Sequence, residues 1–296
     1  MATVQDLKRR IRSVGNTEKI TKAFELVASA RLRRAESRIA AMRPYADRML
    51  ELMGVTAQAA GSVRLPLLER REEVTRVALL PITADRGLAG AFNAQVLRRA
   101  FALERELRGE GIDVKWLASG RRGRSTLTFR RYELIQAWQG FSERPDYADA
   151  QAIARRAADL YATHEVDRVV IVYNRYKSPL VQVVTVQDLL PIPEKVIEGG
   201  EDDAKEAALL GDFIYEPEPE QILERLLPVY VETELYRALL ESAASEQGAR
   251  MTAMRNASKN AGELIANLTL AMNRARQAEI TQEILEVVAG ADALTA

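Results

Sequence analysis

The sequence predicts an α/β protein in which the N- and C-terminal helices form a long antiparallel coiled coil. Heptad stripes of apolar residues mark both ends of the chain, and strand-like and helix-like segments alternate between them. Ala, Arg, Glu and Leu are abundant while aromatic residues make up only 6%, a bias typical of long helices. The expected domains are an N-terminal coiled-coil helix over 1–58, an α/β body over 72–215 and a C-terminal coiled-coil helix over 220–290.

The N-terminal helix shows apolar residues in alternating steps of four and three, which predicts a left-handed coiled coil. This seam comprises Ala35, Ile39, Met42, Ala46, Met49, Met53 and Thr56. Upstream we expect the register to slip between two apolar sets, Val4, Leu7, Ile11 and Val14 on one side and Ile20, Phe24 and Val27 on the other. Gly15 to Thr17 should weaken the helix at the slip, and Pro44 should bend it.

The middle of the chain alternates strands with helices, which predicts a Rossmann-like body with a mostly parallel sheet. Short runs rich in β-branched residues indicate strands at Val74–Thr83, Ile112–Ser119, Arg168–Tyr176 and Leu180–Ile192. Apolar residues at helical spacing indicate covering helices at Ala91–Leu107 and Asp149–Thr163.

The C-terminal helix carries a second heptad seam that is rich in alanine, which allows close approach of two helix axes. Its members are Met254, Ala257, Ala261, Leu264, Leu268, Ala271, Ala275, Ala278 and Leu285, with polar Gln282 at one position. Pro217 and Pro219 precede the helix, and Gly290 is the expected terminator. At 1.5 Å per residue the two terminal helices would be about 80 and 100 Å long. They can meet only if the middle folds back, so we expect an antiparallel pair projecting from the body.

Composition excludes several classes of site. The chain has no cysteine and a single histidine, His164, so thiolate metal sites and sites with two imidazoles are excluded. No run of 18 apolar residues occurs. Residues 1–50 hold 12 Lys/Arg against 5 Asp/Glu, a basic stretch that suggests an acidic partner surface. We identify no set of residues that would support catalysis within this chain.

The segment ITADRGLAGAFN, Ile82 to Asn93, follows a strand and opens a helix, where phosphate sites often lie. Neither the dinucleotide-binding nor the P-loop glycine pattern is present, so Gly87 and Gly90 indicate a tight turn instead. Asp85 and Arg86 could pair locally or face a partner. Two alternatives stay open at this point: a nucleotide-binding α/β protein with helical tails, and a coiled-coil adaptor or nucleic-acid tether.

Three stretches of the sequence resemble the gamma subunit of bacterial F-type ATP synthase. They are SVGNTEKITKAFELVASARLRRAE, ITADRGLAGAFN and the C-terminal pair ASEQGARMTAMRNASKNA and NRARQAEITQEILEVVAGADAL. The matches lie at both ends and in the centre, in the family's order. At Ala89 the family often has a cysteine. The paired cysteines of the chloroplast regulatory loop are missing, and with them thiol control.

The resemblance implies a rotor shaft without a catalytic site. In the family the terminal helices turn inside a ring of three alpha and three beta subunits, and the body meets the epsilon subunit and the membrane c-ring. One copy per complex is implied, peripheral to the cytoplasmic side of the bacterial membrane, with no nucleic acid. No cofactor is expected on this chain, because partner subunits bind Mg-ATP and ADP.

The resemblance also implies partner contacts at matching positions. Phe24 occupies a position that the family often fills with Met, near a moving, acidic segment of a beta subunit, and a basic stretch lies beside it. The full set of expected contacts is Lys19, Lys22, Phe24, Arg34, Glu246, Arg250, Arg276, Gln277 and Thr281. Ala289, Ala291 and Ala293 suit an apolar collar around the tip. The role of the acidic segment 194–211 stays open.

Overall fold

The computed structural model describes residues 3–61, 65–193 and 216–295. The chain divides into two compact units. The terminal unit combines Met1–Ala28 with Met251–Ala296, and the sheet unit comprises Ser29–Arg250. Two long helices, α1 (Val4–Ala60) and α6 (Pro219–Thr295), contribute to both units. The acidic segment 194–211 lies outside the described residues.

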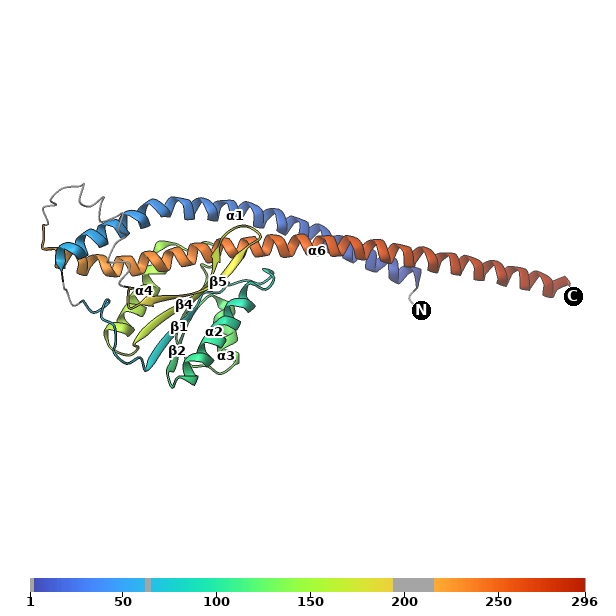
Figure 1. Cartoon of the computed structure of the whole chain (residues 1–296). Coiled ribbons are helices and arrows are strands. Elements are labelled where there is room, and N and C mark those ends of the chain that lie inside the picture. Colours follow the sequence, from blue (N-terminus) through green and yellow to red (C-terminus); the bar gives the residue numbers. More distant parts are fainter. Residues whose placement is uncertain (1–2, 62–64, 194–215, 296) are drawn as a thin grey trace. The chain divides into compact units, whose positions relative to one another are not determined.

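The sheet unit contains a five-stranded sheet in the order β3-β2-β1-β4-β5 (Figure 1). The strands are β1 (Arg76–Pro81), β2 (Asp113–Ser119), β3 (Leu134–Trp138), β4 (Arg168–Tyr176) and β5 (Gln182–Leu190). All neighbours pair in parallel except β4 and β5, which are antiparallel. The predicted mostly parallel sheet is confirmed. Strand β3 was not predicted, because it is short and none of its residues is fully buried.

Helices cover both faces of the sheet, because consecutive residues of β1 and β4, whose side chains point to opposite faces, are buried. Ala78 and Leu80 of β1 pack on the face covered by α4 (Tyr147–Ala162). Val77 and Leu79 pack on the other face, with α2 (Phe92–Gly109) and α3 (Arg121–Phe129) (Figure 1).

Sequence reasoning recovered two of these covering helices and missed α3. Helices α2 and α4 lie within two residues of their predicted bounds. Helix α3 was not predicted because it has nine residues, three of the first four are arginines, and only Gly123 and Leu127 are buried.

The core on the α4 face also contains parts of both long helices. Met49, Met53 and Ala57 of α1 belong to it. Its α6 members are Leu223, Leu227, Tyr230, Val231, Leu235, Ala238 and Leu239. This stretch of α6 is therefore an integral part of the sheet unit, held by the removal of apolar surface from water.

In the terminal unit the ends of α1 and α6 pack against each other in antiparallel register. Arg255 donates from Nε to the Glu25 carboxylate at 2.9 Å. A Cβ built on Gly262 would lie 3.5 Å from Glu18 Oε1, and one built on Gly15 would lie 3.9 Å from Ile265 Cδ1. The two residue numbers add to the same total in all three pairs, as antiparallel packing requires. The predicted antiparallel coiled coil is confirmed.

The seam of α1 follows one uninterrupted heptad repeat, so the predicted slip of register near Gly15 is wrong. Buried or half-buried residues recur in steps of four and three at Leu7, Ile11, Val14, Glu18, Thr21, Glu25, Ala28, Leu32 and Ala35, and then along the predicted set to Thr56. Polar residues hold the seam at three positions that the apolar pattern had assigned elsewhere. Ile20, Phe24 and Val27 are instead exposed, by 55%, 45% and 48%. The helix continues through Gly15 to Thr17 and past Pro44.

The seam of α6 agrees with the prediction at Met254, Ala261, Leu268 and Ala275 and differs by one residue at the positions between them, where Ser258 joins the half-buried Ala257. The observed members are Met254, Ser258, Ala261, Ile265, Leu268, Met272 and Ala275. Leu264 and Ala271, which were predicted for the seam, are exposed. The prediction that Gly290 ends the helix is also wrong, because α6 continues to Thr295.

The last part of α6 has no helix of the terminal unit opposite it. The antiparallel register places Arg276 opposite Val4, where α1 begins. From residue 276 to 291 every described side chain of α6 is exposed, including the predicted seam residues Ala278 and Leu285.

Gly120, at the end of β2, allows two loops of the sheet unit to approach closely. It has a φ of 91°, and a Cβ there would lie 2.0 Å from the Thr83 carbonyl oxygen. Around it, Thr83 N donates to Ser119 O at 2.9 Å, and Gly123 N donates to Thr83 Oγ1 at 2.8 Å. No side chain fits without moving the backbone.

We therefore predict that Gly120→Ala lowers the free energy of unfolding by more than about 3 kcal/mol, since strain and a backbone clash combine. Gly111→Ala is the matched control, because Gly111 has a similar φ of 83° but nothing within 4 Å of a new Cβ. It should cost only about 1–2 kcal/mol. Urea unfolding followed by circular dichroism measures both, and equal costs would contradict the close approach.

Candidate functional site

The turn that follows β1 is fixed by side chains of the sheet unit itself. The Asp85 carboxylate accepts hydrogen bonds from the backbone N–H groups of Arg121 (2.9 Å), Gly140 (2.8 Å) and Ser142 (3.0 Å). The N–H of Asp85 donates to Ser142 Oγ, and the N–H of Ala84 donates to Asn93 Oδ1. Asp85 therefore joins three loops, and the N–H groups at the start of this turn are already used within the protein.

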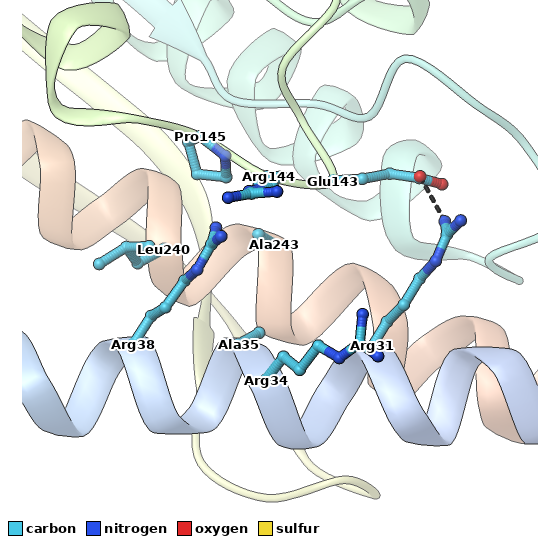
Figure 2. Close-up of a pocket in the computed structure, with 9 residues that line it drawn as sticks. All are labelled: Arg31, Arg34, Ala35, Arg38, Glu143, Arg144, Pro145, Leu240 and Ala243. Atoms are coloured by element: carbon cyan, nitrogen blue, oxygen red, sulfur yellow. Dashed lines mark hydrogen bonds and ion pairs between the residues drawn. The ribbon is translucent and has the colours of Figure 1, made fainter.

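Glu143, in the loop before α4, is a carboxylate shared by three arginines. Arg31 of α1 binds it directly, as the dashed line in Figure 2 shows. Arg250 of α6 lies 3.3 Å from it and Arg86 lies 3.7 Å from it. Arg86, which the sequence left between a local pair and a partner contact, is thus within ion-pair distance of this loop.

Glu246 and Arg250 form a buried ion pair beside the same loop. Arg250 Nη2 lies 2.6 Å from Glu246 Oε1, and the two side chains are 9% and 1% exposed. Arg250 also donates to the carbonyl oxygen of Gly87 at 3.3 Å. Burial raises the pKa of the Glu246 carboxyl, although the neighbouring guanidinium opposes that shift. Both residues were expected at a partner surface, and they lie in the interior of the sheet unit.

The expected contacts on the N-terminal half of α1 lie on its outward side. Lys19 is exposed. Lys22 is 59% exposed and donates to Glu25 at 2.9 Å. An exposed apolar strip is formed by Ile20, Phe24 and Val27, which lie on successive turns of the helix. We refer to Ile20, Phe24 and Val27 as the outer strip. Sequence reasoning named Phe24 only, because it placed all three in the seam.

Arg34, the remaining α1 contact expected from the sequence, is exposed in the sheet unit, where it lines a pocket with Arg31 and Arg38 (Figure 2).

The expected contacts near the end of α6 are exposed as well. Arg276, Gln277 and Thr281 all lie on the stretch of α6 without an opposing helix. The Thr281 hydroxyl donates to the Gln277 carbonyl at 2.8 Å. Exposed apolar side chains lie on the same stretch of α6: Ile280, Ile284, Leu285, Val287 and Val288. Of these, the sequence analysis had named only Leu285, as a seam residue. Ala289 is also exposed.

Within the described ranges, no group of three or more His, Cys, Asp or Glu side chains could hold a metal ion. His164 follows the end of α4 in a left-handed conformation, with a φ of 60°.

Across residues 3–61, 65–193 and 216–295, no helix combines the length and the apolar character needed to cross a bilayer.

The fold and these surfaces define a class of protein: an α/β unit combined with paired terminal helices that carry exposed polar and apolar side chains. Comparison with known proteins names the family within that class. The chain matches the ATP synthase family over residues 3–294. It is 48% identical to the ATP synthase gamma chain of Rubrobacter xylanophilus and 45% identical to that of Moorella thermoacetica, covering 99–100% of each pair. The chain belongs to the family of ATP synthase gamma chains.

Solved structures of rotors share the fold. A chain of the central stalk and c-ring of Tetrahymena thermophila mitochondrial ATP synthase is similar at a TM-score of 0.58 and 28% identity, covering 81% of this chain and 99% of that one. A chain of the Euglena gracilis mitochondrial ATP synthase rotor has a TM-score of 0.66 at 18% identity, covering 94% and 98%. The second likeness concerns the fold alone.

The buried pair gives a direct test of how the 82–93 turn is held. Arg250→Met leaves Glu246 buried without its cation and should lower the free energy of unfolding by about 3 kcal/mol. The double variant Glu246→Gln with Arg250→Met should recover part of this loss, because no charge is then left unpaired. Thermal and urea unfolding of the full chain measures both effects.

Arg48→Met is the matched control, since Arg48 pairs with Glu51 on the surface, with side chains 79% and 43% exposed. It should cost less than about 1 kcal/mol. If Arg250→Met costs no more than Arg48→Met, the buried pair does not hold the turn.

Proposed function

We propose that this chain is the central rotor shaft of an F-type ATP synthase. The observation that carries the proposal is the antiparallel packing of the two chain ends in a protein 48% identical, over its whole length, to a gamma chain. In this proposal, rotation of a membrane c-ring turns the shaft, and the shaft drives the conformational cycle of the catalytic subunits in ATP synthesis or hydrolysis.

The proposed partners are a ring of three alpha and three beta subunits, an epsilon subunit and the c-ring, with one copy of this chain per complex. Support comes from the Tetrahymena assembly, described as central stalk and c-ring, to which this chain is similar. The location that follows is peripheral, at the cytoplasmic side of the bacterial membrane. Nucleic acid has no part in this proposal, although the first helix is basic.

The mechanism rests on asymmetry. Three chemically identical catalytic sites can differ only if something contacts each of them differently. A shaft made of two unequal helices presents a different surface in each direction. Its differential contacts bias one subunit toward an open state and another toward a closed state, and rotation reassigns that bias. Mg-ATP and ADP are bound by partner subunits, and this chain contributes no catalytic residue.

The outer strip and its basic neighbours are the proposed contact with the moving segment of a beta subunit. Ile20, Phe24 and Val27 offer apolar surface that nothing within the described terminal unit covers, and Lys19 and Lys22 add positive charge beside it. This combination suits an amphipathic, acidic helix or loop. Arg34 provides a further cation on the same helix, outside the terminal unit.

Arg276, Gln277 and Thr281 are the proposed polar contacts between the shaft and the ring, since they are exposed and lie where α6 has no opposing helix. The apolar residues from Ile280 to Val288 suit a close-fitting apolar collar. Glu246 and Arg250 have a different role in this proposal. Because they are buried, they act as positioning residues that hold the turn at Gly87.

Reconstitution with alpha and beta subunits tests the proposal. A complex that contains this chain should hydrolyse ATP cooperatively, and alpha and beta without it should not. Phe24→Asp should lower the activation of hydrolysis roughly fivefold or more, the size of a typical coupling between two sites. Its effect on the thermal stability of the isolated chain should be small, because the side chain is already 45% exposed.

The control is Phe129→Asp at the end of α3, where the side chain is 88% exposed and outside the terminal unit. It should leave activation unchanged. Equal hydrolysis with and without this chain would overturn the proposed function. If the Phe24→Asp variant activates ATP hydrolysis as fully as the parent chain, the outer strip is not the contact with the beta subunit.

A further inference from the structure

A small basic pocket in the sheet unit lies between α1, α6 and the loop that leads into α4 (Figure 2). Its volume is about 250 Å³. The lining residues are Arg31, Arg34, Ala35, Arg38, Glu143, Arg144, Pro145, Leu240 and Ala243. Four guanidinium groups and one carboxylate thus line the cavity, and the rest of its lining is alanine, leucine and proline.

The single carboxylate of the pocket does not neutralise these cations. Glu143 binds Arg31 and is shared with Arg250 and Arg86, which do not line the pocket. Within the described part of the chain, the side chains of Arg34, Arg38 and Arg144 have no ion-pair or hydrogen-bond partner. Asp146 lies in the neighbouring hollow with Arg38, yet no ion pair joins the two.

The arginines converge from two sides. Arg31, Arg34 and Arg38 lie on successive turns along one face of α1. Figure 2 shows Arg38 rising from α1 toward Arg144, which comes from the facing loop. That loop is held in place because Arg144 N donates to Phe141 O at 2.9 Å and Glu143 binds Arg31. Two unpaired guanidinium groups that face each other across a cavity repel unless an anion lies between them.

We propose that this pocket binds a small phosphate-class oxyanion, phosphate or pyrophosphate, between Arg38 and Arg144. The planar fork of donors on each guanidinium matches the several oxygens of such an anion. The volume of about 250 Å³ falls below the roughly 300–1,000 Å³ of pockets that enclose drug-sized ligands. A whole nucleotide is therefore too large, and only its phosphate end would enter.

The bound anion joins α1 to the loop before α4 within the sheet unit. It replaces repulsion between Arg38 and Arg144 by two attractive contacts, so it stabilises the folded state by binding linkage. This inference does not depend on the proposed function, since the isolated full-length chain contains every residue of the pocket.

Isothermal titration calorimetry of the full chain with sodium pyrophosphate, at constant ionic strength, tests the inference. One saturable site should appear. Arg38→Gln with Arg144→Gln should weaken it by about tenfold or more, because both charge-assisted contacts are lost. Arg33→Gln is the matched control on the same helix, since Arg33 is exposed and does not line the pocket. It should leave the affinity unchanged.

Thermal unfolding separates binding from a merely structural effect. Without the anion, the double variant should melt at the same temperature as the parent chain or higher, because a like-charge contact is removed. Saturating pyrophosphate should raise the melting temperature of the parent chain and leave that of the double variant unchanged. If the double variant responds to pyrophosphate as the parent chain does, binding is not in this pocket and the inference fails.

Three further ligands identify the source of the anion. The inference is supported if phosphate and pyrophosphate both bind and if the affinity for ATP is no higher than that for pyrophosphate. The adenosine part of ATP then contributes nothing to binding. ATP binding far tighter than pyrophosphate would contradict it and indicate a nucleotide site. Binding of a poly-glutamate peptide alone would also contradict it and point to an acidic protein partner, as would the absence of any saturable binding.

Discussion

The antiparallel packing of α1 against α6 is the interaction on which both units of this protein depend. In the sheet unit, Met53 of α1 and Leu227 of α6 belong to the same core, which covers one face of the sheet. In the terminal unit the helices have only each other, and buried alanines such as Ala28 and Ala261 allow a close approach. Most of the stability of helices in proteins comes from packing of this kind and not from intrinsic helix propensity.

Polar residues in the α1 seam explain both the register and the proposed contact surface. Glu18, Thr21 and Glu25 take positions where apolar residues would give more stability. Hydrogen bonds from Lys22 and then Arg255 hold the pKa of the Glu25 carboxyl below its ordinary value, so the buried group stays charged and paired. A buried polar group of this kind specifies one register at some cost in stability. The apolar side chains of Ile20, Phe24 and Val27 are thereby left on the outside.

The exchange of polar residues into the seam and apolar residues out of it also shows where prediction from the sequence succeeded and where it failed. The sheet strands β1, β2, β4 and β5 were predicted well because β-branched runs bounded by turns are a local signal. The slip near Gly15 was predicted wrongly because an apolar pattern cannot reveal seam positions that are held by polar residues such as Glu18, Thr21 and Glu25. Asp85 could not be placed from sequence, since its three donors come from residues 36 to 57 positions away in the chain.

The proposed partner contacts were likewise predicted in part: some lie on exposed helix faces, and two are buried. Resemblance to the family identified positions on exposed helix faces, but it could not separate them from Glu246 and Arg250, whose burial depends on the sheet unit around them. The basic pocket has no local signal either, because Arg144 lies more than a hundred residues from Arg38. Long-range packing alone brings these two guanidinium groups together.

Disulfide trapping of the two chain ends tests the central claim most directly, and the chain's lack of cysteine makes the experiment clean. Gly15→Cys combined with Ile265→Cys places two thiols at facing positions of the terminal unit. Mild oxidation should link them rapidly within one chain, whereas Gly15→Cys with Met272→Cys, two helical turns away, should stay unlinked. Efficient linkage of the second pair, or failure of the first, would contradict the antiparallel register from which the account of this protein begins.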